Sequence, residues 1–293
     1  MRLRAYAKIN LGLDILGKRP DGYHEVKMIM QTIQMYDLLE IKKKKIPGIG
    51  LISNVPYVPA DERNLAYKAA KLLMDEFKVQ EGLSIKLEKF IPVAAGMAGG
   101  SSDAAAVMVG VNRLFQLGLT DQELMERSVQ IGADVPYCIL RGTALAEGIG
   151  ERLTPLPALP KCCVLIGKPS VSVSTKTAYE SLDLAAVPVH PDIDGMIRDI
   201  QAGDLDGVVS RMGNVFEPGI QKRHPVIGDI SRLMEEHGAM KAMMSGSGPT
   251  VFGIFKDGDQ MERAAAALRD SHLAKVVFAT EIYNRNGGNT NDK

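Results

Sequence analysis

The sequence has few cysteines, no excess of either charge and no long apolar run, and each lack excludes a class of protein. Its 293 residues include 35 basic and 35 acidic side chains, so the formal net charge is zero. A nucleic-acid partner usually leaves a basic excess, so we expect none. No apolar segment approaches the roughly 20 residues that span a bilayer, and the N-terminus lacks the compact apolar core of a signal peptide. We therefore expect a cytoplasmic protein with no membrane segment.

The three cysteines, Cys138, Cys162 and Cys163, form no CxxC pair. An odd number without such spacing is typical of reduced thiols in a cytoplasm and does not favour a structural metal site. The rest of the composition, 45% hydrophobic and 24% charged, is that of an ordinary globular protein long enough for two domains. We expect a monomer or a weak homodimer.

Hydrophobic periodicity predicts a mixed first half. Apolar residues at every second position from Leu3 to Leu13 indicate a strand, and the turn at Arg19–Gly22 predicts a hairpin with a second strand. Further strands are expected at 38–44 and 82–91. Helices are expected at 64–77, from the glycine-containing segment 92–106 to Gly118, and from Thr120 to Gly132. A hairpin is expected at 142–154. The second strand of the first hairpin is expected at 23–33.

Three prolines within Pro155–Pro160 predict a linker, because proline continues neither a helix nor a central strand. Beyond it the pattern predicts strands at 162–167, 239–244, 250–255 and 275–282, with helices at 175–182, 191–201, 204–213, 226–237 and 259–270. Interleaved helices and strands that begin with antiparallel hairpins indicate an α+β fold in both halves. We expect domains at 1–155 and 161–283 and a disordered tail at 284–293.

The segment Pro92–Ala106 is the strongest functional signal. Gly96, Gly99 and Gly100 permit close backbone approach to an anion, and Ser101, Ser102 and Asp103 are typical helix-start residues. The N-terminus of a helix carries about half a positive charge and unpaired N–H groups, so it suits a phosphate. A glycine-rich turn with a serine cap is the alternative, but small residues from Ala94 to Ser102, interrupted only by Met97, exceed what a cap requires.

A second small-residue turn, Ser245–Thr250, separates two apolar strands. Alone it would be an ordinary hairpin loop. If the two glycine loops meet at one cleft between the halves, they would enclose a polyphosphate.

Polar residues elsewhere allow two interpretations each. Lys8 lies on the strand face opposite Ala7 and Ile9, where it is either a site residue or a solvated lysine. Asp134 follows a helix and precedes an expected apolar strand, which is also a common place for a turn or cap aspartate. Tyr23 and His24 follow a tight turn and either clamp a base or are ordinary strand residues.

Three segments together resemble the GHMP kinase superfamily: AKINLGLDILGKRPDGYHEV at 7–26, IPVAAGMAGGSSDAAA at 91–106 with IGADVPYCILRGTALAEGIGE at 131–151, and MSGSGPTVFGIF at 244–255. The resemblance covers nearly the whole chain. It implies a ribosomal-S5-like N-terminal domain, a ferredoxin-like C-terminal domain and an active site between them. The GYHE and GGSSDAA segments are similar to the branch that uses ATP to phosphorylate the 2-hydroxyl of 4-diphosphocytidyl-2-C-methyl-D-erythritol, in the non-mevalonate route to isoprenoids.

This resemblance also implies roles for individual residues. Asp134 corresponds to the catalytic base and Lys8 to its charged partner, with Mg²⁺ expected beside ATP and Ser102 as its candidate ligand. The implied nucleotide-binding positions are Asn64, Pro92, Ala94, Ala95, Gly96, Met97, Ala98, Gly99, Gly100, Ser101 and Ser102. The implied positions for the cytidine diphosphate substrate are Asn10, Tyr23, His24, Thr175, Tyr179, Gly246 and Ser247.

The sequence departs from its relatives at Ala94, Ala95 and Ala98, where many have glycine, so these positions cannot adopt positive φ as easily and we expect the nucleotide to sit slightly differently. Two other functions stay open. One is a different kinase of the superfamily, such as a mevalonate or homoserine kinase; the other is a non-catalytic protein on the same scaffold, either an RNA binder or a nucleotide sensor.

Overall fold

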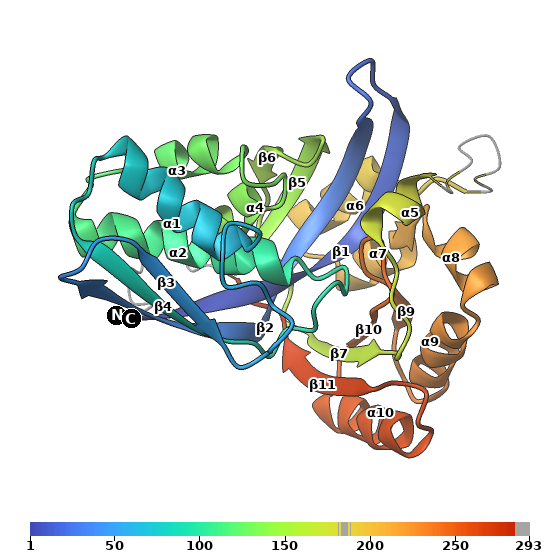
Figure 1. Ribbon diagram of the computed structural model, residues 1–293. Helices are drawn as coiled ribbons and strands as arrows, with labels where there is room; N and C mark the ends of the chain where they lie inside the picture. Colours follow the sequence, from blue (N-terminus) through green and yellow to red (C-terminus); the bar gives the residue numbers. More distant parts are fainter. Residues whose placement is uncertain (181, 183–186, 188, 285–293) are drawn as a thin grey trace.

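Two β-sheets with helices packed on them make up the protein (Figure 1). The computed structural model describes residues 1–180, 182, 187 and 189–284. The expected α+β fold is confirmed. The predicted tail lies outside the described residues, apart from Asn284, as does residue 181 of the expected helix at 175–182.

Among the described residues, seven strands form the first sheet, in which β3, β4, β2, β1 and β8 follow one another and β5 and β6 extend from β2. One part of the long β2 pairs with β4 and another with β5, while β1 runs antiparallel along most of its length. The bounds are β1 Arg2–Lys18, β2 His24–Lys44, β3 Ile49–Ser53, β4 Gly82–Glu88, β5 Thr143–Gly148, β6 Arg152–Pro155 and β8 Gly213–Asn214.

A single strand, β2, replaces the two strands expected at 23–33 and 38–44. Residues 34–37 contain no glycine or proline, and Tyr36 and Asp37 stay in register with β1. The apolar alternation fades there because Gln34 is exposed, not because the strand ends. The short edge strand β3 was missed, since its five residues follow directly on a turn containing proline and glycine.

The first sheet is covered by helices α1 to α4, of which α1 and α2 cross it side by side (Figure 1). Two of these helices begin where the sequence predicts: Asn64 caps α1, and Thr120 forms a capping box with Glu123 at α3. The bounds are α1 Leu65–Glu76, α2 Gly99–Phe115, α3 Asp121–Ser128 and α4 Val135–Leu140.

The apolar run after Asp134 forms a helix, α4, and not the expected strand. A short apolar run does not distinguish the two by periodicity. Pro136 lies in the first turn of α4, where its missing N–H costs nothing, and Asp134 takes the N-cap position. The expected strand was therefore wrong, although the aspartate was placed correctly at an element boundary.

The second sheet is antiparallel, in the order β11-β7-β10-β9, and α9 and α10 pack against it. Its predicted strands are confirmed with ends shifted by a few residues. The helix α8 and the two-residue β8 were not predicted. The bounds are β7 Cys163–Lys168, β9 Lys241–Met244, β10 Val251–Phe255, β11 Val276–Glu281, α5 Thr175–Glu180, α6 Ile193–Ala202, α7 Leu205–Arg211, α8 Glu217–Arg223, α9 Val226–Glu236 and α10 Gly258–Asp270.

The two halves share one apolar core instead of meeting through a loose linker. Ile9 and Ile33 of the first sheet belong to the same buried cluster as Phe252 and Met243 of the second. Leu159, within the proline-rich connection, is itself buried in this cluster. Burial of each such side chain stabilises the folded state by about 1.5–3 kcal/mol, so the relative position of the halves is held by packing.

Glu217, the first residue of α8, is a partly buried acid between the second sheet and this helix. Its Oε1 accepts hydrogen bonds from the Met244 N–H at 2.9 Å and from Gln221 Nε2 at 3.0 Å. Burial nevertheless raises the pKa of Glu217 to about 7, from an ordinary value of 4.5. The folded protein therefore binds this proton more tightly than the unfolded chain does.

Replacing Glu217 by Gln should remove a pH dependence of stability. A raised acid pKa means that stability is lost as pH rises from about 4.5 to about 7, and the ionised form at pH 8 costs on the order of 3 kcal/mol. Gln keeps the accepting oxygen without the charge. We expect Glu217→Gln to match the parent near pH 5 and to exceed it increasingly up to pH 8 in thermal denaturation. A difference in melting temperature that is constant over this range would contradict the assignment.

Candidate functional site

A pocket of about 1250 Å³ lies between the two halves, at the end of the first sheet where both glycine loops converge. Pockets for one small ligand have volumes of about 300–1,000 Å³, so this pocket has room for two substrates. Of the residues singled out in the sequence, those that line it are Lys8, Asn10, Tyr23, His24, Ala94, Ala95, Gly96, Ala98, Gly99, Gly100, Ser101, Asp134, Thr175, Tyr179, Gly246 and Ser247.

Lys8 and Asp134 meet in the middle of the pocket. The Lys8 Nζ lies 3.9 Å from a carboxylate oxygen of Asp134 and donates a hydrogen bond to Asn10 Oδ1 at 2.6 Å. Lys8 is only 5% exposed, so the interpretation as a solvated lysine is wrong. The pairing of β1 with β2 shifts register on both sides of the 8–10 segment, and such irregularities re-aim side chains.

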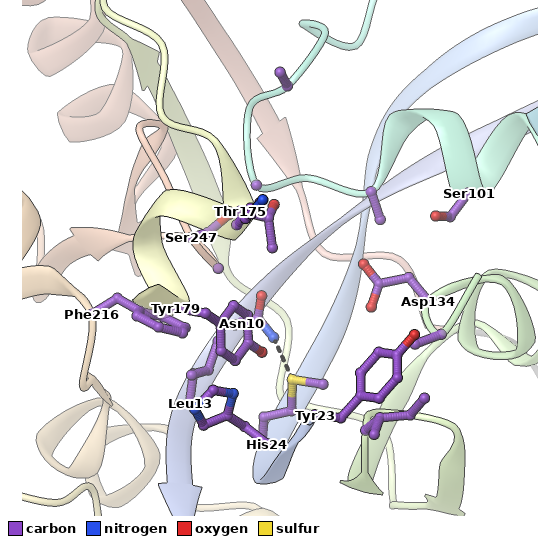
Figure 2. Close-up of a pocket in the computed structure, with 18 of the residues that line it drawn as sticks. Asn10, Leu13, Tyr23, His24, Ser101, Asp134, Thr175, Tyr179, Phe216 and Ser247 are labelled. Carbon is purple, nitrogen blue, oxygen red and sulfur yellow. Dashed lines mark hydrogen bonds between the residues drawn. The ribbon is translucent and has the colours of Figure 1, made fainter. Parts of the chain in front are cut away.

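Asp134 reaches the pocket from the start of α4, and its side chain is one-third exposed. Figure 2 shows its carboxylate directed into the cavity, opposite the wall that carries Thr175 and Tyr179. A carboxylate in this position, next to an ammonium group, can accept a proton from a bound alcohol.

The first glycine loop is fixed at its start by a buried ionic cluster. The Asp37 carboxylate accepts hydrogen bonds from the Phe90 and Ile91 N–H groups, and Lys89 donates to both Asp37 and Asp103. Burial raises the pKa of Asp103 well above its ordinary value, which favours its protonated form beside Asp37. The cluster therefore anchors the loop and the first turn of α2 to the sheet without excess buried charge.

The loop leads into α2, whose first residues Gly99, Gly100 and Ser101 face the pocket. The helix begins earlier than expected, since its cap is Ala98 and Ser101 already lies inside the first turn. Ala94 and Ala98 adopt positive φ, 52° and 54°, in spite of their side chains, whereas Ala95 does not. Seventeen residues of helix aim their N-terminus, and its positive dipole end, at the cavity.

The two glycine loops are in direct contact. Ser245 Oγ donates a hydrogen bond to the Gly96 carbonyl at 3.0 Å. A Cβ atom on Gly96 would lie 2.2 Å from the Ser245 carbonyl oxygen, and Gly96 also has a φ of 74°. The expected meeting of the loops at one cleft is confirmed, and it leaves no room for a side chain at this glycine.

Aromatic rings form the opposite wall. The rings of His24 and Tyr179 lie 5.1 Å apart, and Phe216 packs edge-on against Tyr179 at 4.8 Å (Figure 2). Burial raises the pKa of Tyr179 to about 12, so its hydroxyl stays protonated near neutral pH. Tyr23 is 59% exposed at the rim. Phe216 was missed from the sequence because it lies in a segment with no apolar period.

The chain matches the profiles of two families, "GHMP kinases N terminal domain" over residues 64–142 and "GHMP kinases C terminal" over residues 196–274. The chain belongs to the GHMP kinase family. Proteins called 4-diphosphocytidyl-2-C-methyl-D-erythritol kinase resemble it along nearly their whole length. The protein from Lachnospira eligens is 53% identical over 97% of this chain and 98% of its own, and the one from Lachnoclostridium phytofermentans is 52% identical over 96% and 97%.

Solved structures agree with this GHMP kinase assignment. A crystal structure of 4-(cytidine 5'-diphospho)-2C-methyl-D-erythritol kinase superimposes with a TM-score of 0.82 at 31% identity, covering 97% of this chain and all of the other. An L. major mevalonate kinase superimposes with a TM-score of 0.74 at 18% identity, covering 97% and 96% of the two chains, which shows a shared fold.

Four of the expected site residues of this GHMP kinase do not line the pocket: Asn64, Pro92, Met97 and Ser102. Asn64 accepts from the Ala66 N–H as the cap of α1 and donates to the Pro59 carbonyl. The Met97 carbonyl accepts from the Lys8 N–H, which fixes β1 to the loop. The Ser102 hydroxyl is buried and donates to the Tyr6 carbonyl. This geometry favours structural roles for Asn64 and Ser102 over nucleotide and magnesium binding.

The described residues contain no group of three or more His, Cys, Asp or Glu side chains that could hold a metal ion. Magnesium in nucleotide sites takes one or two protein ligands, with phosphate and water supplying the rest. The Asp134 carboxylate and the Ser101 hydroxyl both line the pocket near the start of α2. These two oxygens fit such a site, in which most ligands come from the nucleotide.

Ala98→Gly should stabilise the protein. Left-handed backbone costs a non-glycine residue about 1–2 kcal/mol, while glycine loses roughly 0.5–1 kcal/mol through the flexibility of the unfolded chain. We expect a net gain on the order of 0.5 kcal/mol in chemical denaturation. Ala95→Gly is the matched control, because Ala95 lies in the same loop without positive φ and should lose stability. Equal effects of the two substitutions would show that the strain at Ala98 is absent.

Proposed function

We propose that this GHMP kinase transfers the γ-phosphate of ATP to the 2-hydroxyl of 4-diphosphocytidyl-2-C-methyl-D-erythritol, in the non-mevalonate route to isoprenoid precursors. The names of its relatives at 47–53% identity support this reaction. One observation of the site carries it: a single pocket has a helix N-terminus at one end and an aromatic wall at the other, with Lys8 and Asp134 between them.

The ATP end is built mainly from backbone groups. In this proposal the N–H groups of residues 94–101 and the positive end of α2 bind the β- and γ-phosphates, as helix N-termini do for anions. The dipole contributes about 0.3–2 kcal/mol, which is too little to hold a triphosphate alone. Mg²⁺, held by the phosphates together with the Ser101 hydroxyl, would supply further charge neutralisation when bound.

Asp134 acts as the base for the acceptor hydroxyl. Phosphoryl transfer has a loose transition state, so orientation of the alcohol and charge stabilisation matter more than early deprotonation. Asp134 accepts the hydrogen bond of the alcohol and takes its proton as the bond to phosphorus forms. The Lys8 ammonium, 3.9 Å away, stabilises the negative charge on the attacking oxygen and on the phosphoryl group. Asn10, which accepts from Lys8 Nζ, keeps the ammonium aimed at this point.

The aromatic wall binds the cytidine end. Tyr23, His24 and Tyr179 provide ring faces and polar tips for stacking on the base and hydrogen bonding to it. Thr175, Gly246 and Ser247 lie between this wall and the phosphate loop and contact the middle of the substrate. The hydroxyls of Thr175 and Ser247 are 3.1 Å apart, so this contact also joins α5 to the second glycine loop.

This wall argues against the two alternatives. Small acceptors such as mevalonate or homoserine carry no base on which the rings of Tyr23, His24 and Tyr179 could stack. A non-catalytic scaffold has no need for a buried ammonium beside a partly exposed carboxylate in the same pocket.

We further propose that the protein acts in the cytoplasm, where ATP is available, as a monomer or weak homodimer with domains at 1–155 and 161–283. In the part of the chain that the structure describes, no helix has the length and apolar character needed to cross a membrane.

Release of ADP in a coupled assay tests the reaction directly. The purified protein is given ATP and, in parallel, the cytidylylated methylerythritol, mevalonate or homoserine. We expect turnover with the first acceptor to exceed the other two by at least about a thousandfold, because the unused cytidine subsite contributes nothing to small acceptors. Comparable turnover of mevalonate or homoserine would overturn the proposed substrate, and no turnover with any acceptor would overturn the proposed enzyme class.

Asp134→Asn should abolish most turnover and leave nucleotide binding intact. The amide preserves the shape of the side chain but does not take up a proton, and general-base catalysis contributes about 10²–10⁴-fold. We expect kcat to fall within this range, with a nucleotide Kd within about twofold of the parent value. Asp270→Asn, at the exposed end of α10, is the control for the substitution itself. Turnover of Asp134→Asn close to that of the control would exclude the base assignment.

A further inference from the structure

Asn214 is a buried amide that does not line the pocket itself but forms hydrogen bonds to two segments that do. It belongs to β8, which pairs in parallel with β1 at Gly12 and Leu13, and it is 7% exposed. Its Nδ2 donates hydrogen bonds to two carbonyls, those of Met244 at 2.9 Å and Gly246 at 2.8 Å. Its Oδ1 accepts from the Phe216 N–H at 3.0 Å. Both donors and the acceptor of the side chain are therefore satisfied.

These three bonds join parts of the pocket that have different functions. Gly246 belongs to the second glycine loop, and Phe216 supports the Tyr179 ring of the aromatic wall. Both residues line the cavity, whereas Asn214 does not. The amide thus links the loop to the wall through its own hydrogen bonds.

The loop has little freedom to compensate for a loss of this link. A Cβ on Gly246 would lie 3.0 Å from the Gly96 carbonyl oxygen and 3.3 Å from Asn10 Oδ1, so the loop packs directly on the other loop and on the Lys8–Asn10 pair. Glu217 Oε1 holds the Met244 N–H from the same side. A displaced Gly246 would therefore move against the groups that surround the acceptor hydroxyl.

We propose that Asn214 is a positioning residue that sets the second glycine loop in register with the aromatic wall, so that a cytidylylated acceptor lies with its hydroxyl at Asp134. The phosphate cradle at 94–101 has anchors of its own, Asp37 and Lys89, in addition to its contact with the second loop at Gly96. Loss of Asn214 should accordingly impair use of the acceptor and leave nucleotide binding unchanged. This inference rests on the proposed function.

Asn214→Asp tests the proposal with an isosteric change. The carboxylate still accepts from Phe216 but donates to neither Met244 nor Gly246, and it repels both carbonyls. We expect kcat/KM for the acceptor to fall roughly tenfold to a hundredfold, as small misplacements of substrate do, with nucleotide Kd within about twofold of the parent. Because a protonated Asp regains one donor, the ratio of variant to parent activity should rise as the pH is lowered.

Asn112→Asp is the matched control, because Asn112 makes the same kind of two-way contact far from the pocket. Its Nδ2 donates to the Leu119 carbonyl at 2.8 Å and its Oδ1 accepts from the Leu119 N–H at 3.0 Å. This variant should lose stability while its kinetic constants stay at parent values. Equal kinetic constants in Asn112→Asp and Asn214→Asp, or an equal loss of nucleotide and acceptor binding in Asn214→Asp, would overturn the positioning role.

Asn214→Ser keeps one hydrogen-bond donor, and it tests the positioning role of Asn214 if the aspartate variant does not fold. We expect a smaller fall in acceptor kcat/KM with the same unchanged nucleotide Kd; failure of both variants to fold would reject the proposal in favour of a purely structural role. Turnover by the parent protein distinguishes a failure of this proposal from a failure of the proposed function. If the parent phosphorylates another alcohol of the panel, the substrate assignment fails and the variants are compared on that alcohol.

Discussion

The contact between Gly96 and Ser245 is the constraint on which the site depends. It joins the Ser245 hydroxyl of the second half to the Gly96 carbonyl of the first by a hydrogen bond, and the two backbones leave no room for a Cβ at Gly96. Both loops line the pocket next to this contact. A contact this close tolerates little movement, so each loop needs a rigid anchor behind it.

The two loops are held by side chains of different chemistry. Behind the first loop, the Asp37 carboxylate accepts from two backbone N–H groups, while the Lys89 ammonium balances its charge and also bonds to Asp103. Behind the second loop, the neutral amide of Asn214 donates to two carbonyls. The first loop presents N–H groups that an acid can accept from, and the second presents carbonyls that an amide can donate to. Each anchor is the side chain that matches the exposed backbone groups.

Small residues and period-2 alternation are local signals, so they predict the loops and the strands around them. The Lys8–Asp134 pair is predicted only by the resemblance to a known family. The sequence does not predict that Lys8 is buried, since this depends on the packing of β1 against segments distant in the sequence, such as α2 and the Asp134 segment at the start of α4. The resemblance predicts that Asn64 and Ser102 bind ligands, yet in the structure Asn64 caps a helix and Ser102 bonds to a backbone carbonyl, and only geometry distinguishes these uses. Asn214 and Phe216 carry no periodic signal, and their importance comes from what lies beside them in space.

The two ends of the pocket are built from different kinds of group. The phosphate end consists of backbone N–H groups and a helix terminus, which is why Ala94 and Ala98 can stand in left-handed positions without changing what is presented to an anion. The acceptor end consists of side chains on β1, β2, α5 and the segment before α8. In the proposed function, the specificity of this chain lies in the wall formed by His24, Tyr179 and Phe216, because these rings come from elements that do not form the phosphate loop.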